Sequence, residues 1–434
     1  MAAPGGEEYA LYLPSAYDPA RRWPVIYLLD ARGRALTPME RFQAAAERYG
    51  YVLASTYGSA SDVPMEGTVR ALQETWNDTH RRLALDERRA ALAGFSGTVR
   101  AACVVAAAAP GHARAVVGSG GGFPLGQAPT ARTPFAFFGA AGNRDFNHGE
   151  MQRLADQLSS LGLPHRNEVF EGGHQWLPEA LALRAVEWLE LLDMRAGARP
   201  RDEALIAALW ERDAGEARAA AAGGDAWEAE RRFRALAADF DGLRVVEGAR
   251  AEAAALARSE AWKKASRRRA ARLRREDGER ARAQAVVERA LREESVPMAA
   301  ARLASDLRLD TMKRRAEARD DEGDLHARVL AWLSAQTGFY LPRLMAERGE
   351  HRKAALLLEV ATVLRPESAD LRYELAAALA RDGSEKRALG ELERAVEMGF
   401  ADAARLRADE AFARLRGGAA FQRLLQGIPR ARVP

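Results

Sequence analysis

The chain has 434 residues, of which 48% are hydrophobic and 29% charged, so it is not a disordered chain and two or three globular domains are expected. Its 65 basic and 61 acidic side chains nearly balance, which favours solubility over a nucleic-acid partner. No apolar run in the sequence reaches the roughly 18 residues that a membrane-spanning helix needs.

The single cysteine, Cys103, excludes an intrachain disulfide and a cysteine cluster for a metal ion. Met1–Glu8 contain neither the basic nor the apolar segment of a signal peptide. As it stands, the chain is therefore expected in the cytoplasm, whereas a chain from which a leader had been removed would be secreted or periplasmic. Neither a metal nor another cofactor is expected.

Over residues 1–198, short apolar runs alternate with helical patterns. In chain order the patterns predict a strand over Tyr9–Leu13, a strand over Pro24–Asp30, a helix over Pro38–Tyr49, a strand over Tyr51–Ser55, a helix over Glu66–Leu83, a strand over Arg89–Phe95, a helix over Gly97–Ala109, strands over Ala113–Gly118 and Pro134–Gly139, a helix at about 147–161, a strand over His165–Phe170 and a helix at about 178–194. Such alternation is typical of an α/β domain, with a mostly parallel sheet flanked by helices.

After residue 198 the strand signals stop, and Ala, Arg, Glu and Leu recur at helical spacing. A shift of 34 residues maps Leu341, Met345, Gly349, Ala354, Leu358 and Ala361 onto Leu375, Leu379, Gly383, Ala388, Leu392 and Ala395. This period is typical of tetratricopeptide repeats, which are helical hairpins. The sequence therefore predicts an all-α domain over 331–434, made of such repeats and C-terminal capping helices.

Residues 199–330 form a charged helical region between these two domains, with a fainter copy of one repeat unit around Gly224 and Phe233. Its basic run KKASRRRAARLRR (263–275) could bind nucleic acid or anionic lipid. Acidic residues follow the run closely and no aromatic residues interrupt it, so a solvated helix face is the preferred interpretation. No nucleic-acid partner is predicted.

The segment Gly94-Phe95-Ser96-Gly97-Thr98 lies between a predicted strand and a predicted helix. A small–x–Ser–x–small sequence in that position matches the nucleophile elbow, a tight turn that exposes a reactive serine. The last position is usually glycine, so Thr98 departs from the pattern. The main-chain N–H of Gly97 would contribute to an oxyanion hole.

A serine nucleophile needs a histidine as its base and a carboxylate to orient that histidine. Asp145 and His174 follow successive strands, in the order serine, acid, histidine. Asp145 could instead cap the following helix, and His174 could be an ordinary polar loop residue. The remaining histidines fit the role of base less well: His80, His112, His148, His165, His326 and His351.

Residues 9–195 resemble the α/β-hydrolase superfamily, and most of all its phospholipase/carboxylesterase, dienelactone hydrolase and polyester-depolymerase-like esterases. The resemblance lies in LYLPSAYDP…WPVIYLLD, the elbow, GSGGGFP (118–124), GNRDF (142–146) and GGHQW (172–176). It implies Ser96 as nucleophile, Asp145 as acid and His174 as base, in an α/β-hydrolase catalytic domain over 1–198.

The resemblance also implies a second oxyanion donor after the strand Pro24–Asp30, where such esterases usually carry His-Gly. Here Asp30-Ala31-Arg32-Gly33 stands instead. The main-chain N–H of Ala31 or Arg32 could serve, but the Asp30 carboxylate would oppose an oxyanion unless Arg32 or Arg34 neutralises it. Three aromatic residues are candidates for the substrate pocket, with ordinary packing as the alternative: Tyr57, Phe123 and Trp176.

The sequence thus predicts a carboxylic-ester hydrolase (EC 3.1.1) that acts on a small-molecule or polymeric ester, with helical repeats that bind a protein or peptide. One alternative is an interaction or scaffold protein whose hydrolase domain is catalytically weak. Another is a peptidase of the same fold.

Overall fold

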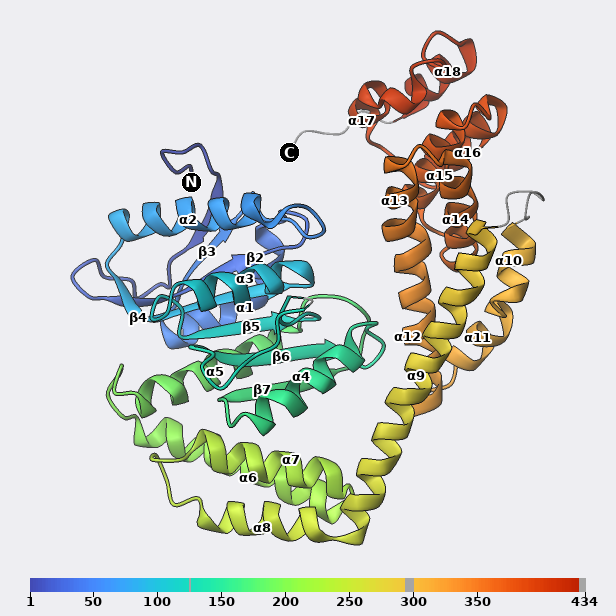
Figure 1. Cartoon of the computed structure of the whole chain (residues 1–434). Helices are drawn as coiled ribbons and strands as arrows, with labels where there is room; N and C mark the ends of the chain where they lie inside the picture. The colour runs from blue at the N-terminus through green and yellow to red at the C-terminus, as the bar shows by residue number, and fades with distance from the viewer. Residues whose placement is uncertain (125, 293–299, 429–434) are drawn as a thin grey trace. The chain divides into compact units, whose positions relative to one another are not determined.

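The computed structural model describes residues 1–124, 126–292 and 300–428, and the chain forms two compact units, Met1–Ala271 and Arg272–Pro434 (Figure 1). The first unit holds the sheet and its flanking helices, and the second has helices and no strand among its described residues.

A seven-stranded sheet forms the centre of the first unit, in the order β1-β3-β2-β4-β5-β6-β7. Strand β1 is antiparallel to β3, and all other neighbouring strands are parallel. The strands are β1 (Tyr9–Tyr12), β2 (Trp23–Leu29), β3 (Val52–Thr56), β4 (Leu85–Phe95), β5 (Ala115–Ser119), β6 (Ala136–Gly142) and β7 (His165–Phe170). The expected fold class, a mostly parallel sheet flanked by helices and followed by an all-helical region, is confirmed.

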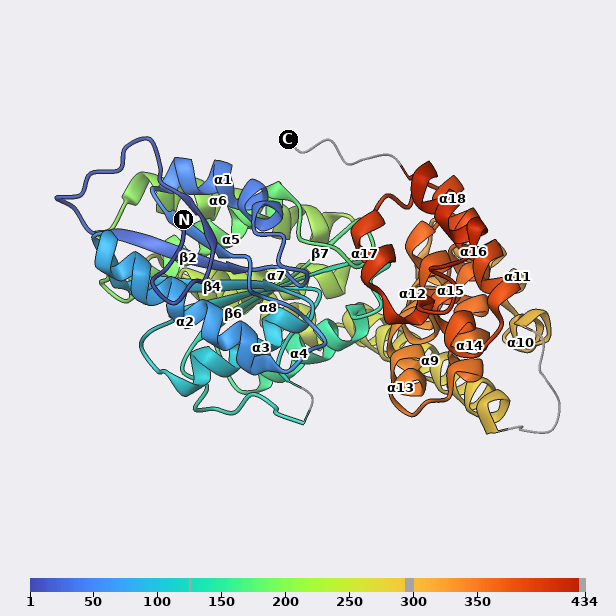
Figure 2. The ribbon, with the colours of Figure 1, turned by 90° about the horizontal axis from the view of Figure 1, so that it is seen from above.

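Helices cover both faces of this sheet, as Figure 2 shows. Ile26 and Leu28 of β2 pack into one apolar layer, whereas Val25, Tyr27 and Leu29 pack into the other. Because both faces are covered, β2 is buried along its whole length, which explains its unbroken apolar sequence. The helices are α1 (Leu36–Tyr49) and α5 (Glu179–Arg195) on one face, and α2 (Met65–Arg82), α3 (Gly97–Ala108) and α4 (His148–Ser160) on the other.

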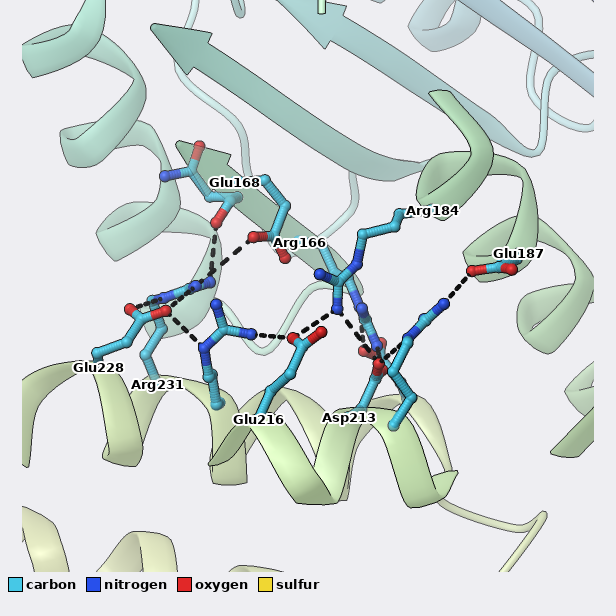
Figure 3. A network of polar contacts seen from close by, with 12 residues as sticks. Arg166, Glu168, Arg184, Glu187, Asp213, Glu216, Glu228 and Arg231 are labelled. Atoms are coloured by element: carbon cyan, nitrogen blue, oxygen red, sulfur yellow. Dashed lines mark hydrogen bonds and ion pairs between the residues drawn. The ribbon is translucent and has the colours of Figure 1, made fainter. Parts of the chain in front are cut away.

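Three further helices lie wholly in the first unit: α6 (Glu203–Ala222), α7 (Ala226–Asp239) and α8 (Glu247–Arg258). They share an apolar cluster with Leu191 and Met194 of α5, to which Leu209 and Phe233 contribute. A polar network joins α6 and α7 to β7, the edge strand of the sheet (Figure 3).

Arg166 of β7 is the buried centre of that network. Its Nε donates to Asp239 Oδ2 at 2.6 Å, and its Nη2 donates to Asp213 Oδ2 at 2.5 Å. Asp239 Oδ1 also accepts from Trp188 Nε1 at 2.7 Å. Burial alone would lower the pKa of Arg166, but the charges of Asp239 and Asp213 outweigh burial and raise it. Arg166 therefore stays charged and anchors α6 and α7 to the sheet.

The two compact units divide between Ala271 and Arg272, within α9. The expected domain bounds, 1–198, 199–330 and 331–434, stay predictions. Arg231 also joins α7 to β7, since its Nη1 donates to the main-chain oxygen of Asn167 at 2.8 Å. Helical periodicity indicates which side chains share a face, but it does not show which charged residues will pair across elements.

The second unit consists of helices and short turns. They are the C-terminal part of α9 (Glu260–Arg292), α10 (Ala300–Asp306), α11 (Leu309–Ala316), α12 (Asp321–Ala335), a π-helical turn (Gln336–Tyr340), α13 (Leu341–Glu347), α14 (His351–Leu364), α15 (Ala369–Arg381), α16 (Glu385–Glu397), α17 (Ala403–Ala408), a 3-10 turn (Glu410–Phe412) and α18 (Ala419–Gly427). Among the described residues, no helix is both long and apolar enough to cross a membrane.

Helices α13–α16 repeat a pattern at the expected offset of 34 residues. Gly349 and Gly383 lie between the two helices of each pair with φ of 74° and 83°, a conformation that glycine adopts without strain. In the second helix of each pair, Ala354 and Ala388 are both buried. The equivalent residues Leu358 and Leu392, and Ala361 and Ala395, are buried as well. The assignment of these pairs to the tetratricopeptide family stays a prediction.

We predict that Arg166→Met destabilises the first unit strongly, because it leaves Asp213 and Asp239 buried without their main counter-charge. The free energy of unfolding should fall by about 3–5 kcal/mol, measured by urea denaturation followed by tryptophan fluorescence. The matched control is Arg218→Met, since Arg218 is 62% exposed and should change stability by less than about 0.5 kcal/mol. Equal losses in the two variants would contradict a structural role for the network.

Candidate active site

Ser96 lies in a strained turn between β4 and α3. Its φ of 57° and ψ of −127° are unfavourable for a residue other than glycine, at a cost of order 1–3 kcal/mol. The turn also requires small neighbours, because a Cβ at Gly94 would lie 2.8 Å from the main-chain nitrogen of Val99. The serine N–H donates to Ser119 O at 2.9 Å, which ties the turn to β5.

Thr98 replaces the usual glycine of the elbow and is completely buried. Its Oγ1 accepts from the N–H of Phe95 at 3.0 Å and lies 2.6 Å from Leu29 O and 2.8 Å from Phe95 O. Its single hydroxyl proton can be donated to one of these carbonyl oxygens at a time. The threonine therefore fits because its side chain links the turn to the end of β2.

Ser96, His174 and Asp145 form a continuous hydrogen-bonded chain. Ser96 Oγ lies 2.9 Å from His174 Nε2, and His174 Nδ1 lies 2.9 and 3.1 Å from the two carboxylate oxygens of Asp145. Because a carboxylate only accepts hydrogen bonds, Nδ1 carries the proton and Nε2 is left to accept from the serine. Asp145 is completely buried, while 19% of the His174 side chain is exposed.

The loops that carry Asp145 and His174 are hydrogen-bonded to each other. They follow β6 and β7, which are neighbours in the sheet. The N–H of Arg144 donates to Gly172 O at 2.9 Å, and the N–H of Gly172 donates to Asn143 Oδ1 at 2.9 Å. These contacts fix the acid loop against the base loop.

The histidine ring is packed between two aromatic side chains. Its centroid lies 4.6 Å from that of Phe95 and 4.2 Å from that of Phe146. Gly120, after β5, permits this arrangement, since a Cβ there would lie 2.7 Å from Asp145 Oδ2 and 3.0 Å from His174 Nδ1. The glycine run of GSGGGFP is thus a sequence signal for the close approach of Asp145 and His174 to the loop after β5.

The structure also shows the surroundings of Asp145, as a possible helix cap, and of the other histidines. Asp145 Oδ1 accepts from the N–H of Asn147 at 2.7 Å, so it stabilises the turn before α4 in addition to holding His174. His80 and His165 bond to main-chain oxygens of Trp76 and Leu163. Burial lowers the pKa of both of these histidines. Of the described histidines, only His174 is hydrogen-bonded to Ser96.

The two predicted oxyanion donors after β2 differ in the structure. The N–H of Arg32 donates to Asp30 Oδ1 at 2.9 Å, so it is already engaged. Within the described part of the chain, the N–H groups of Ala31 and Gly97 have no acceptor. Ala31 is therefore the residue after β2 that has a free donor, beside Gly97 at the start of α3.

Asp30 is completely buried and is neutralised by Arg34, not by Arg32. Its carboxylate accepts from Arg34 Nε at 3.0 Å, from the N–H of Arg34 at 3.1 Å and from Trp176 Nε1 at 2.8 Å. Burial alone would raise the pKa of Asp30, but these hydrogen bonds outweigh burial and hold the pKa below its ordinary value. The charge is thus balanced, and it holds together the turn after β2 and the base loop.

The three candidate pocket residues have different surroundings. Trp176 is 5% exposed and packs beside Phe95, so it belongs to the core. Phe123 stacks on Phe135 with a centroid distance of 5.6 Å. Tyr57 is 44% exposed. Among the described residues, no group of three or more His, Cys, Asp or Glu side chains is placed to hold a metal ion.

We predict that Asp30→Asn lowers the free energy of unfolding by about 1–3 kcal/mol at pH 7, because the charge-assisted hydrogen bonds are lost. The pKa of Asp30 is lower in the folded chain than in the unfolded chain. The stability that its charge contributes is therefore present above the unfolded pKa and is lost as the pH falls through the folded pKa.

Urea denaturation should therefore be measured at several pH values. The difference in the free energy of unfolding between wild type and Asp30→Asn should shrink below about pH 4. Asp18→Asn serves as the control, since Asp18 is exposed and accepts from the N–H of Ala20. If the difference in the free energy of unfolding between wild type and Asp30→Asn stayed constant over the whole pH range, this role of the Asp30 charge would be contradicted.

No protein-family model and no curated protein sequence matches this chain. Among solved structures, it is similar to a ferulic acid esterase (16% identity, TM-score 0.36, covering 44% of this chain and 94% of that one). It is also similar to FphF, a fluorophosphonate-binding serine hydrolase of Staphylococcus aureus (13%, 0.35, 42% and 92%). A third similar structure is esterase LipW of Mycobacterium marinum (18%, 0.35, 43% and 78%). At these identities and TM-scores, an inference about activity rests on the geometry around Ser96.

Proposed function

We propose that this chain hydrolyses carboxylic esters through an acyl-serine intermediate, with Ser96 as the nucleophile. The observation that carries the proposal is the hydrogen-bonded chain from Ser96 Oγ to His174 Nε2, at 2.9 Å, and from His174 Nδ1 to Asp145 Oδ1, also at 2.9 Å. A serine hydroxyl is too weakly acidic to attack an ester unaided, and a histidine held by a carboxylate supplies the missing base.

In the proposed reaction, His174 takes the proton of Ser96 as Oγ attacks the ester carbon, and Asp145 stabilises the resulting imidazolium. The N–H groups of Gly97 and Ala31 donate to the oxyanion of the tetrahedral intermediate. Since Gly97 is the first residue of α3, the positive end of the helix dipole adds to this stabilisation. His174 then protonates the leaving alcohol and later activates a water molecule, which releases the acid and restores Ser96.

We predict that the purified chain is labelled by a fluorophosphonate probe and hydrolyses 4-nitrophenyl acetate, and that Ser96→Ala abolishes both. Ser96→Ala and His174→Gln should each lower kcat by roughly four orders of magnitude or more, because each removes an essential member of the triad. The control is Ser160→Ala, an exposed serine whose Oγ donates to Gln157 O, which should leave both readouts unchanged.

The outcomes separate the alternatives. A wild-type chain that is neither labelled nor active favours a scaffold protein with a catalytically weak hydrolase domain. Labelling with turnover of aminoacyl amides in preference to short esters identifies a peptidase. Labelling of Ser96→Ala at the wild-type rate rejects Ser96 as the nucleophile.

The second unit is proposed to bind a protein or peptide. Supporting observations are the paired helices of α13–α16 and an exposed apolar pair, Tyr340 and Leu344, which are 37% and 38% exposed. Tyr340 ends the π-helical turn and Leu344 lies on α13, and we take the two side chains together as the candidate binding surface.

We predict that Leu344→Asp prevents the recovery of a partner that co-purifies with the wild-type full chain, because a buried charge at the interface is unfavourable. The control is Val245→Asp, at a residue of the first unit that is 82% exposed. Recovery of the same proteins by all three chains, compared by quantitative mass spectrometry, would exclude this surface as the binding site.

A further inference from the structure

Ser61, in the segment after β3, carries a hydroxyl without a role in the fold. Its Oγ is shielded from solvent and has no hydrogen-bond partner within the described residues. Buried hydroxyls are normally hydrogen-bonded, because an unsatisfied buried polar group is unfavourable. An unsatisfied hydroxyl near a reactive serine is therefore a candidate for a bond made only during the reaction.

The main chain of this segment is fixed to the turn that holds Ala31. The N–H of Ser61 donates to Ala31 O at 2.9 Å, and Ala60 forms a β-bridge with Arg32. Two residues earlier, Ser59 Oγ donates to Asp30 O at 2.8 Å. The position of Ser61 is therefore set by the same turn that supplies the second oxyanion donor.

On its other side, the Ser61 hydroxyl lies against the elbow. A Cβ built at Gly97 would lie 2.8 Å from Ser61 Oγ, so the hydroxyl occupies the space that any larger residue after the nucleophile would need. Ser61 Oγ is thus next to Gly97 and on a segment bonded to Ala31, the residues whose N–H groups have no acceptor within the described chain.

Backbone strain accompanies this arrangement. Only three described residues other than glycine have a positive φ: Asp62 at 61°, Ser96 at 57° and Arg308 at 55°. One is the proposed nucleophile, and another directly follows Ser61. Strained residues of this kind persist where the surrounding structure holds them, and they cluster at active sites.

We propose that the Ser61 hydroxyl is a third oxyanion donor and hence a catalytic residue of the ester hydrolysis proposed above, on which this inference rests. When the bond between Ser96 Oγ and the ester carbon forms, the carbonyl π electrons move onto the oxygen. The Ser61 O–H donates to that oxygen together with the N–H groups of Gly97 and Ala31, and it keeps its proton throughout. As the tetrahedral intermediate collapses, the hydrogen bond weakens and the hydroxyl returns to its unsatisfied state.

The test is Ser61→Ala in the full chain, with 4-nitrophenyl acetate as substrate. We expect kcat to fall by roughly 10- to 1,000-fold with little change in KM, because the hydroxyl acts on charge that develops in the transition state. We expect the melting temperature to stay the same or to rise, since the substitution removes an unsatisfied buried hydroxyl. Ser59→Ala is the matched contrast for stability and should lower the melting temperature, because the bond to Asp30 O is lost.

A second readout separates an oxyanion donor from a residue that only shapes the site. The thiono analogue, O-(4-nitrophenyl) thionoacetate, develops charge on sulfur, which accepts hydrogen bonds poorly. The wild-type chain should strongly prefer the oxygen ester, and Ser61→Ala should reduce that preference. Ser160→Ala, far along the chain on α4, should keep both the rate and the preference of the wild type.

An unchanged kcat and an unchanged preference in Ser61→Ala, with an active wild type, would overturn the role of Ser61 and leave the proposed hydrolysis intact. A fall in kcat with an unchanged preference would likewise overturn it, in favour of a shaping role. A wild-type chain without esterase activity or fluorophosphonate labelling would instead remove the proposed function itself.

Discussion

The buried carboxylate of Asp30 is the group on which both halves of the candidate active site depend. It accepts from the main-chain N–H groups of Arg32 and Arg34, which fixes the turn that presents Ala31, and from Trp176, which fixes the loop carrying His174. An ionised group can be buried only when such partners replace its water. One charge therefore connects the loop of the proposed base to the turn of one proposed oxyanion donor.

Around this charge, the residues of the site are packed closely against one another. The strained backbone of Ser96 is held by bonds to β5 and, through Thr98, to the end of β2. The absence of side chains at Gly97 and Gly120 lets Ser61, Asp145 and His174 approach the turn. Tight packing of this kind explains the glycines at these two positions, at the carboxyl ends of the strands, where ligands of parallel sheets commonly bind.

Helices α6 and α7 support the strand that leads to the candidate active site. Arg166 and Asn167 of β7 are held by Asp213, Asp239 and Arg231 of α6 and α7. Because β7 leads into the loop with His174, these contacts restrain the strand that positions the proposed base. Helices α6 and α7 are thus part of the compact unit that carries the site, while the 34-residue pattern of α13–α16 belongs to the other unit.

The amino-acid sequence by itself determined the α/β class, the order of strands and helices, and the nomination of Ser96, Asp145 and His174. Each of these depends on periodicity or on local turn chemistry, which short segments encode. It left open whether Ala31 or Arg32 would donate and whether Arg32 or Arg34 would neutralise Asp30, and it missed Ser61. Those outcomes depend on contacts between segments that are distant along the chain, such as Asp30 with Trp176, Arg166 with Asp239 and Ser61 with Gly97. Only the tertiary structure decided them, because a hydrogen bond or a steric contact is fixed by positions in space that no local pattern specifies.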